Sequence, residues 1–199
     1  MRGGLSKKEL GVIMAPPYRG KSMALVNLGS NAVIAGRNVL HVSVEMAATK
    51  IAFRYDAKLT GMTFDEISAD PIGFASKLNA FKSLYKGRLV IRDYPARSVS
   101  PFDLQAHIRM LARRHGFRVE LLIVDYADEL KRPKKDNPAY AIGEVFSDLR
   151  AVSFQSNIAI WTATQTTRAG YSKARLDVDD VADSWEKVKI SDVIVALCQ

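Results

Sequence analysis

The stretch VIMAPPYRGKSMALV, from Val12 to Val26, has the pattern of a phosphate-binding loop. From Ala15 it reads A-x-x-x-x-G-K-S, which matches G-x-x-x-x-G-K-[ST] except that alanine replaces the first glycine. In such loops the lysine contacts the β- and γ-phosphates of a nucleotide, and the hydroxyl group binds Mg²⁺. Lys21 and Ser22 are therefore the candidate ligands. The alternative interpretation is a helix N-terminus that reads G-K-S by chance.

Two prolines limit which backbone groups of this loop can hold phosphate. Pro16 and Pro17 have no N–H to donate, so we expect the donors to come after them. The following helix N-terminus adds amides that attract anions. The predicted nucleotide-binding residues are Tyr18, Arg19, Gly20, Lys21, Ser22 and Met23.

Three further polar residues follow apolar runs of the sequence. Asp125 ends the run LLIVD, the pattern of a Walker B acid that holds Mg²⁺ directly or through water. Glu45 follows NVLHVSV and has two interpretations, a base that accepts a proton from attacking water or a cap of the next helix. Gln165 ends IAIWTATQ and either hydrogen-bonds the γ-phosphate or is a satisfied polar residue at a strand end.

These residues need a scaffold that brings them together. Short apolar runs predict buried strands at 10–15, 38–44, 88–94, 119–126, 158–165 and 191–199. Helical segments are predicted between them at 20–35, 47–59, 63–86, 101–115 and 138–155. This alternation predicts an α/β fold with a mostly parallel, twisted central sheet and helices on both faces. Ligands of such sheets bind at the carboxyl ends of the strands, where the candidate residues above are placed.

Two long polar connections also begin at carboxyl ends of predicted strands. The first, from Ala127 to Ala139, contains Asp128 and Glu129, which we expect to be solvated loop charges. It also carries the basic residues Lys131, Arg132, Lys134 and Lys135. The second runs from Thr166 to Lys189 and is rich in basic residues as well. Long loops in compact domains are often functional, so we expect a large partner to bind here.

Composition restricts the class of protein. At 199 residues and 48% apolar content, the chain has the size of one domain with a full core. A net charge of +8 favours a polyanionic partner without identifying one. The apolar runs are much shorter than the roughly 20 residues of a membrane span, and the N-terminus has no leader pattern. With a single cysteine, Cys198, the sequence predicts a soluble cytoplasmic protein without an internal disulfide.

The motifs, in this order, resemble those of the hexameric replicative DNA helicases of DnaB type, whose motor is a RecA-like ATPase domain. The segments that carry the resemblance are GGLSKKELGVIMAPPYRGKS, SVEMAATKIAFR with Arg54, LLIVDY, TATQTTR and DVADSWEKVKISDVIVAL. The first of them is most similar to phage-type members, so a phage-encoded protein of the bacterial cell is expected. Five ordered motifs are far more specific than a lone phosphate loop.

The resemblance implies roles for individual residues. Lys21 and Ser22 become ligands of the nucleotide ATP and of Mg²⁺, Glu45 the catalytic base and Gln165 the γ-phosphate sensor. It also implies a homo-hexameric ring in the full-length protein, with single-stranded DNA in its central channel.

The resemblance further implies that the region from Thr166 to Lys189 faces this channel. The match weakens here, since Ala182 replaces an arginine and Trp185 a glycine that the family often has. We predict that Trp185 packs beneath the loop rather than stacking on a base. The candidate DNA-binding residues are Arg168, Lys173, Arg175, Lys187 and Lys189, the last two being the stronger phosphate contacts.

We expect residues 1–199 to form one RecA-like ATPase domain without the family's N-terminal domain and without its usual C-terminal arginine-finger segment. This predicts weak basal hydrolysis and a mainly monomeric chain, unless Arg168 or Arg175 substitutes for the finger. Two alternative functions remain. One is a recombinase or clock-type ATPase of the same fold, and the other is a non-motor accessory protein that binds ATP or single-stranded DNA with little turnover.

Overall fold

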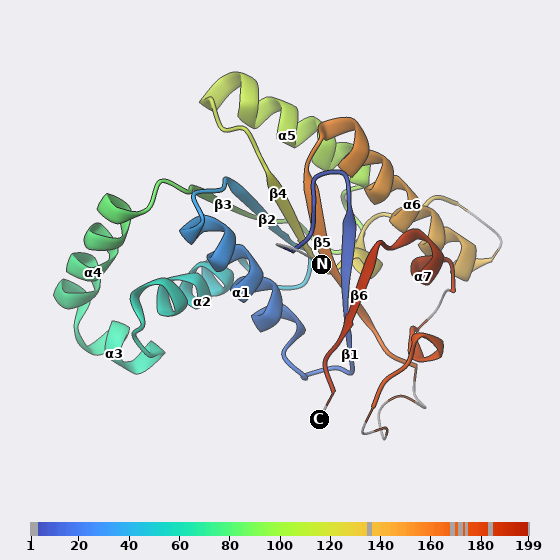
Figure 1. The fold of residues 1–199 in the computed structure, drawn as a ribbon, viewed down its shortest axis with the longest axis horizontal. Helices are drawn as coiled ribbons and strands as arrows, with labels where there is room; N and C mark the ends of the chain where they lie inside the picture. Colours follow the sequence, from blue (N-terminus) through green and yellow to red (C-terminus); the bar gives the residue numbers. More distant parts are fainter. Residues whose placement is uncertain are drawn as a thin grey trace.

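A twisted sheet of six strands forms the centre of the protein, as the computed structural model shows (Figure 1). The structure describes residues 4–134, 137–167, 170, 173, 175–182 and 185–198. The strands are β1 (Leu10–Ala15), β2 (Val39–Ser43), β3 (Leu89–Asp93), β4 (Leu121–Asp125), β5 (Ala159–Gln165) and β6 (Val193–Ala196). They are ordered β3-β2-β4-β5-β1-β6, and every neighbouring pair is parallel. The predicted α/β fold with a parallel sheet is confirmed.

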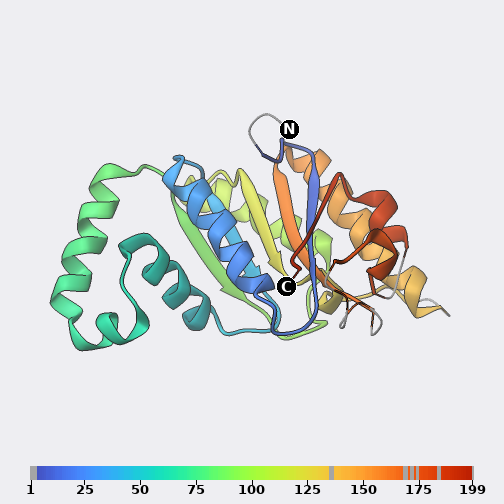
Figure 2. The ribbon, with the colours of Figure 1, turned by 60° about the horizontal axis from the view of Figure 1, so that its bottom comes forward.

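Helices cover both faces of this sheet (Figures 1 and 2). The helices are α1 (Lys21–Ile34), α2 (Ala48–Thr60), α3 (Phe64–Ala69), α4 (Pro71–Leu84), α5 (Pro101–His115), α6 (Pro138–Ser156) and α7 (Glu186–Ile190), with short 3₁₀ helices η1 (Ala127–Glu129) and η3 (Val178–Asp180). Because side chains alternate along a strand, Leu10 and Val12 pack with α5 and α6, whereas Ile13 packs with α1 on the opposite face. The continuous apolar runs of the sequence therefore fill two cores.

The segment predicted as one helix over 63–86 is two helices. Asp70 ends α3 and caps α4, because its carboxylate accepts a hydrogen bond from the Gly73 amide at 2.9 Å. Pro71 occupies the first turn of α4, where a missing N–H costs nothing, but its ring disfavours helical geometry at the residue before it. Helices α3 and α4 extend to one side of the sheet beyond α2 (Figures 1 and 2).

No helix within the described residues combines the length and the apolar character that a bilayer crossing requires.

Candidate functional site

The strand register brings the candidate residues to one edge of the sheet. Ala15, where the phosphate loop begins, lies opposite Gln165 of β5, and Ser43 lies opposite Asp125 of β4. A pocket of about 630 Å³ opens at this edge. Of the residues predicted from the sequence, it is lined by Tyr18, Gly20, Lys21, Ser22, Met23, Glu45 and Gln165. The residues that the prediction did not place in it are Pro17, Met46, Arg54 and Tyr126.

The phosphate loop turns into α1 through left-handed backbone conformations. Gly20 is the N-cap of α1 with φ of 84°, a conformation for which glycine is favoured, and Tyr18 has φ of 61° with a fully exposed side chain. Within the described residues, no side chain caps the N-terminus of α1 and its first turn contains no acidic residue. The amides of the first turn therefore remain available for an anion, as the motif requires. Arg19 is exposed and does not line the pocket.

The Lys21 side chain folds back over this loop. Its Nζ donates to the carbonyl oxygens of Ala15 at 3.0 Å and Pro16 at 2.8 Å. Burial lowers the pKa of the Lys21 ammonium group, and the carboxylates of Glu45, Asp125 and Asp128 act in the opposite direction. The lysine is thus held inside the pocket by weak neutral acceptors, which phosphate oxygens can replace with a stronger charge-assisted bond.

Asp125 and Ser22 form a pair suited to a hard divalent cation. The Asp125 side chain is 2% exposed, and its Oδ2 has no hydrogen-bond partner among the described residues. Burial raises the pKa of this carboxyl group, while a hydrogen bond from the Ser22 hydroxyl lowers it. The described residues contain no group of three or more metal-binding side chains. Mg²⁺ typically takes one or two protein ligands together with phosphate oxygens and water, a number that Ser22 and Asp125 can supply.

The environment of Asp125 predicts opposite effects on stability and on Mg²⁺ binding. A carboxyl group whose pKa is raised by folding is destabilising once pH rises above its unfolded pKa, so at pH 7 the ionised Asp125 costs stability. We expect Asp125→Asn to raise the melting temperature measured without Mg²⁺, because asparagine carries no charge that burial must desolvate. The same variant should lose the extra stabilisation that MgATP gives the wild-type protein. Thermal denaturation with and without MgATP tests both, and unchanged stabilisation by MgATP in the variant would contradict the metal role.

Glu45 does not act as a helix cap. The N-terminus of α2 is held instead by Asp93, whose carboxylate accepts from the Ala48 amide at 3.0 Å, and by Ser43, whose hydroxyl accepts from the Met46 amide at 2.9 Å. The Glu45 side chain is exposed at the end of β2 and lines the pocket. Of the two interpretations left open by the sequence, the helix cap is therefore wrong, and Glu45 is placed where it faces the pocket.

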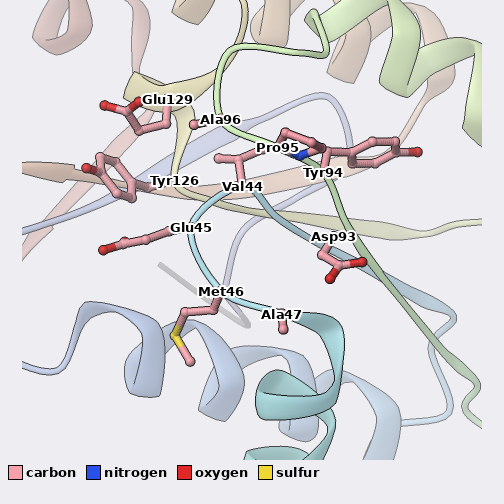
Figure 3. A pocket seen from close by; sticks show the side chains of 10 residues that line it. All are labelled: Val44, Glu45, Met46, Ala47, Asp93, Tyr94, Pro95, Ala96, Tyr126 and Glu129. Atoms are coloured by element: carbon pink, nitrogen blue, oxygen red, sulfur yellow. The ribbon is translucent and has the colours of Figure 1, made fainter.

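A second pocket of about 680 Å³ adjoins the first and shares Glu45, Met46 and Tyr126 with it (Figure 3). Its other walls come from the carboxyl end of β3 and from Glu129, whose carboxylate pairs with Arg97 at 3.4 Å. No residue of the phosphate loop lines it. Glu45 therefore lies at the boundary between the phosphate-side pocket and a second space open to water.

Gln165 is fixed by a residue that the site prediction omitted. Its Nε2 donates to the Tyr126 hydroxyl oxygen at 3.1 Å, and both side chains line the first pocket. Burial raises the pKa of Tyr126 to about 12, with smaller contributions from the Glu129 and Glu45 carboxylates, so the hydroxyl is neutral at pH 7. Arg54, on α2, brings the only side-chain cation besides Lys21 to the pocket among the lining residues described. Both residues lie in the sequence motifs, Tyr126 at the end of LLIVDY and Arg54 at the end of SVEMAATKIAFR, so the motifs could have placed them in the site.

The candidate DNA-binding residues do not form one group. Lys187 is only 1% exposed and pairs with Asp128 at 2.5 Å, so its predicted contact with phosphate is wrong, as is the prediction that Asp128 is solvated. Lys173 pairs with Asp180 at 2.6 Å and Lys189 with Glu186 at 2.9 Å, yet both side chains remain about half exposed. Arg175 is exposed.

The remaining predictions for this region have mixed outcomes. Arg168 lies outside the described residues, and so does Lys135 of the earlier connection. Trp185 is 48% exposed, so it is not packed beneath the loop as predicted. An exposed indole beside α7 leaves a surface on which a base could stack.

Comparison with known proteins agrees with this geometry. The protein-family model for the DnaB-like helicase C terminal domain matches residues 1–198 of this chain. The chain belongs to this family. It is 26% identical to a DnaB-like replicative helicase of Enterobacteria phage T4 over all of the chain and 43% of that relative. It is 30% identical to the replicative DNA helicase DnaB of Haemophilus influenzae over 83% of the chain and 36% of that relative.

Solved structures show the same fold. One solved ATPase domain superposes with a TM-score of 0.85 at 18% identity, covering 98% of this chain and 71% of that one. A DnaB-like replicative helicase, solved in a study of its interactions with primase, gives a TM-score of 0.80 at 19% identity over 97% of this chain and 49% of that one. The fold of this DnaB-like domain is therefore that of the RecA-like helicase ATPase domains. The chain spans less than half the length of the curated relatives above.

Proposed function

We propose that this DnaB-like domain binds ATP with Mg²⁺ and hydrolyses it, and that hydrolysis drives movement along single-stranded DNA and unwinding of duplex DNA. The observation that carries the proposal is that Lys21, Ser22 and Glu45 line one pocket of about 630 Å³, and that Ser22 is hydrogen-bonded to the buried Asp125 carboxyl group. Each of these groups has a different chemical task, and together they are the parts that phosphoryl transfer to water requires.

The site residues divide the work of hydrolysis between them. Lys21 exchanges its two carbonyl acceptors for phosphate oxygens, and Arg54 adds a second positive charge from the wall of the pocket. Ser22 and Asp125 would hold Mg²⁺, whose positive charge would offset negative charge on the phosphates. Glu45 accepts the proton of the attacking water, which enters from the neighbouring pocket. Gln165, held by Tyr126, hydrogen-bonds the γ-phosphate.

The proposal extends to assembly and to DNA. A homo-hexameric ring would supply an arginine from a neighbouring subunit, which is worth about 10³ to 10⁵ in rate in related phosphoryl transfers. The exposed cations Arg175, Lys173 and Lys189 are the candidates for phosphate contacts in the channel of the ring. The isolated chain, if monomeric, should then hydrolyse ATP slowly, and sedimentation at increasing concentration together with the ATPase rate tests this link.

The experiment that tests the proposed function is ATP hydrolysis with and without single-stranded DNA. We expect DNA to increase the rate, and we expect Lys21→Ala to abolish both ATP binding and turnover, because the lysine supplies the phosphate-side charge. Lys50→Ala, which removes an exposed lysine from α2, is the matched control and should change neither. A wild-type chain that binds DNA but never turns over ATP would favour the accessory-protein alternative. Strand exchange without unwinding would favour the recombinase alternative.

A further inference from the structure

The most deeply buried cation of the described chain is not in the nucleotide pocket. Lys187 of α7 is 1% exposed, and its ammonium group has three oxygen partners, the first in an ion pair and the other two through hydrogen bonds. They are Asp128 Oδ1 at 2.5 Å, Thr164 Oγ1 at 2.9 Å and the Ala182 carbonyl oxygen at 3.0 Å. The ring of Phe146 lies 5.3 Å from the same nitrogen. A buried lysine with this complete shell is fixed in position.

The partner carboxylate is fixed as well. Asp128 Oδ2 accepts a hydrogen bond from Thr164 Oγ1 at 2.8 Å, and the Asp128 carbonyl oxygen accepts one from Arg132 at 2.9 Å. Lys187, Asp128 and Thr164 thus form a closed buried cluster, which we call the lysine cluster. Burying an ion pair costs desolvation of both charges, and apolar residues of the same volume would often be as stable. In some proteins such a pair instead fixes one defined arrangement of the segments that carry it.

The segments that the lysine cluster joins lie next to residues of the proposed nucleotide site. Asp128 follows the Mg²⁺ candidate Asp125 by three residues, and Thr164 directly precedes Gln165. The carbonyl of Ala182 binds Lys187, and the amide of the same residue donates to the Gln165 carbonyl oxygen at 3.0 Å.

The backbone extends this connection along the end of β5. Thr166 and Val181 form an antiparallel bridge, and the Thr167 amide donates to the Asp180 carbonyl oxygen at 2.7 Å. The segment 180–182 therefore lies directly against the strand end that carries Gln165. The Lys187 ammonium group holds the same segment through the Ala182 carbonyl oxygen.

We propose that Lys187 is a positioning residue: through the lysine cluster it holds segment 180–182 and α7 against β5 and η1, so that they move together with Gln165. The consequence is that Gln165 at the pocket and the exposed surface of α7, with Trp185 and Lys189, change position as one unit. This consequence deepens the proposed function and rests on it. The holding contact itself does not depend on any activity.

Amide hydrogen exchange by NMR, without nucleotide, tests the contact directly. In Lys187→Met we expect the amides of Ala182 and Thr167 to exchange about tenfold faster or more, because the segment can open without unfolding the sheet. The matched control is Lys189→Met, which makes the same chemical change two residues away on an exposed side chain and should leave both amides as in the wild type. Equal exchange in Lys187→Met and the wild type would overturn the inference.

A second variant guards against misfolding, since Lys187→Met leaves a buried carboxylate unpaired. Asp128→Asn/Lys187→Met removes both charges, keeps an acceptor for Thr164, and should fold while showing the same faster exchange. Unchanged exchange in this folded double variant would overturn the inference too.

Adding a non-hydrolysable ATP analogue with Mg²⁺ separates the two proposals. We expect it to change the exchange of Ala182 in the wild type but not in the double variant. If it has the same effect in both, the coupling through Lys187 is wrong. If it does not bind the wild type, the proposed function fails, whereas faster exchange in the nucleotide-free variants would still establish the holding contact.

Discussion

Replacing Glu45 with glutamine is expected to lower the ATP hydrolysis rate by about 10² to 10⁴, the range for loss of a general base. Glutamine keeps the size and hydrogen-bonding reach of the side chain but cannot take a proton from water. ATP binding should persist, because the phosphates are held by Lys21 and the amides of α1 rather than by Glu45. Single-turnover hydrolysis and equilibrium ATP binding, measured on the same preparations with Mg²⁺ and single-stranded DNA, give the two quantities.

Glu129→Gln is the matched control for this experiment. Glu129 lines the neighbouring pocket, where its carboxylate pairs with Arg97, and it does not line the pocket that contains the phosphate loop (Figure 3). Its replacement should leave the hydrolysis rate within a few-fold of the wild type, since its partner Arg97 is largely exposed to water and the ion pair is long, so the pair contributes little. A similar loss of rate in both variants would mean that the acidic environment matters and that Glu45 is not the base.

Truncating Phe146 to alanine is expected to lower the free energy of unfolding by about 3–5 kcal/mol, the usual cost for a fully buried aromatic side chain. Phe146 is 0% exposed on α6 and belongs to the core between the sheet and α5 and α6. Its ring also lies beside the Lys187 ammonium group, so the change removes packing from the lysine cluster as well. Urea denaturation followed by circular dichroism measures the effect.

Phe154→Ala serves as the control, because it makes the same change two turns later on α6. Its side chain is 62% exposed and its ring lies 4.6 Å from the Lys8 ammonium group. We expect a loss within about 1 kcal/mol, typical of surface positions and of exposed cation–π pairs. Equal losses at the two positions would contradict the description of the core between α6 and the sheet.

Local patterns were sufficient for most of the fold. The apolar runs identified all six strands: β1, β2 and β4 are buried along their whole length, and the edge strands β3 and β6, though only partly buried, are still mainly apolar. The break at Asp70 and Pro71 was not predicted, because it depends on a cap hydrogen bond within a continuous helical pattern, and α7 lies in a segment that was predicted as a polar connection. The residues of the phosphate loop were predictable because their chemistry requires a local sequence.

The charged residues near the end of the chain were predicted least well. Lys187 and Asp128 are 59 positions apart by their numbers, and nothing local distinguishes either from a solvated charge. Only the packing of α7 and η1 against α6 brings them to 2.5 Å and removes both from water. Likewise, Glu45 had two interpretations until the Asp93 carboxylate was found at the N-terminus of α2.

The sequence by itself determined the parallel sheet and the motifs of a phosphate loop and a Walker B acid, because each of these depends on neighbouring residues and on strand burial. The tertiary structure alone decided which charges face the nucleotide pocket and which are buried in the lysine cluster. The physical reason is that desolvation and pairing depend on distances between elements, which no local pattern of residues contains.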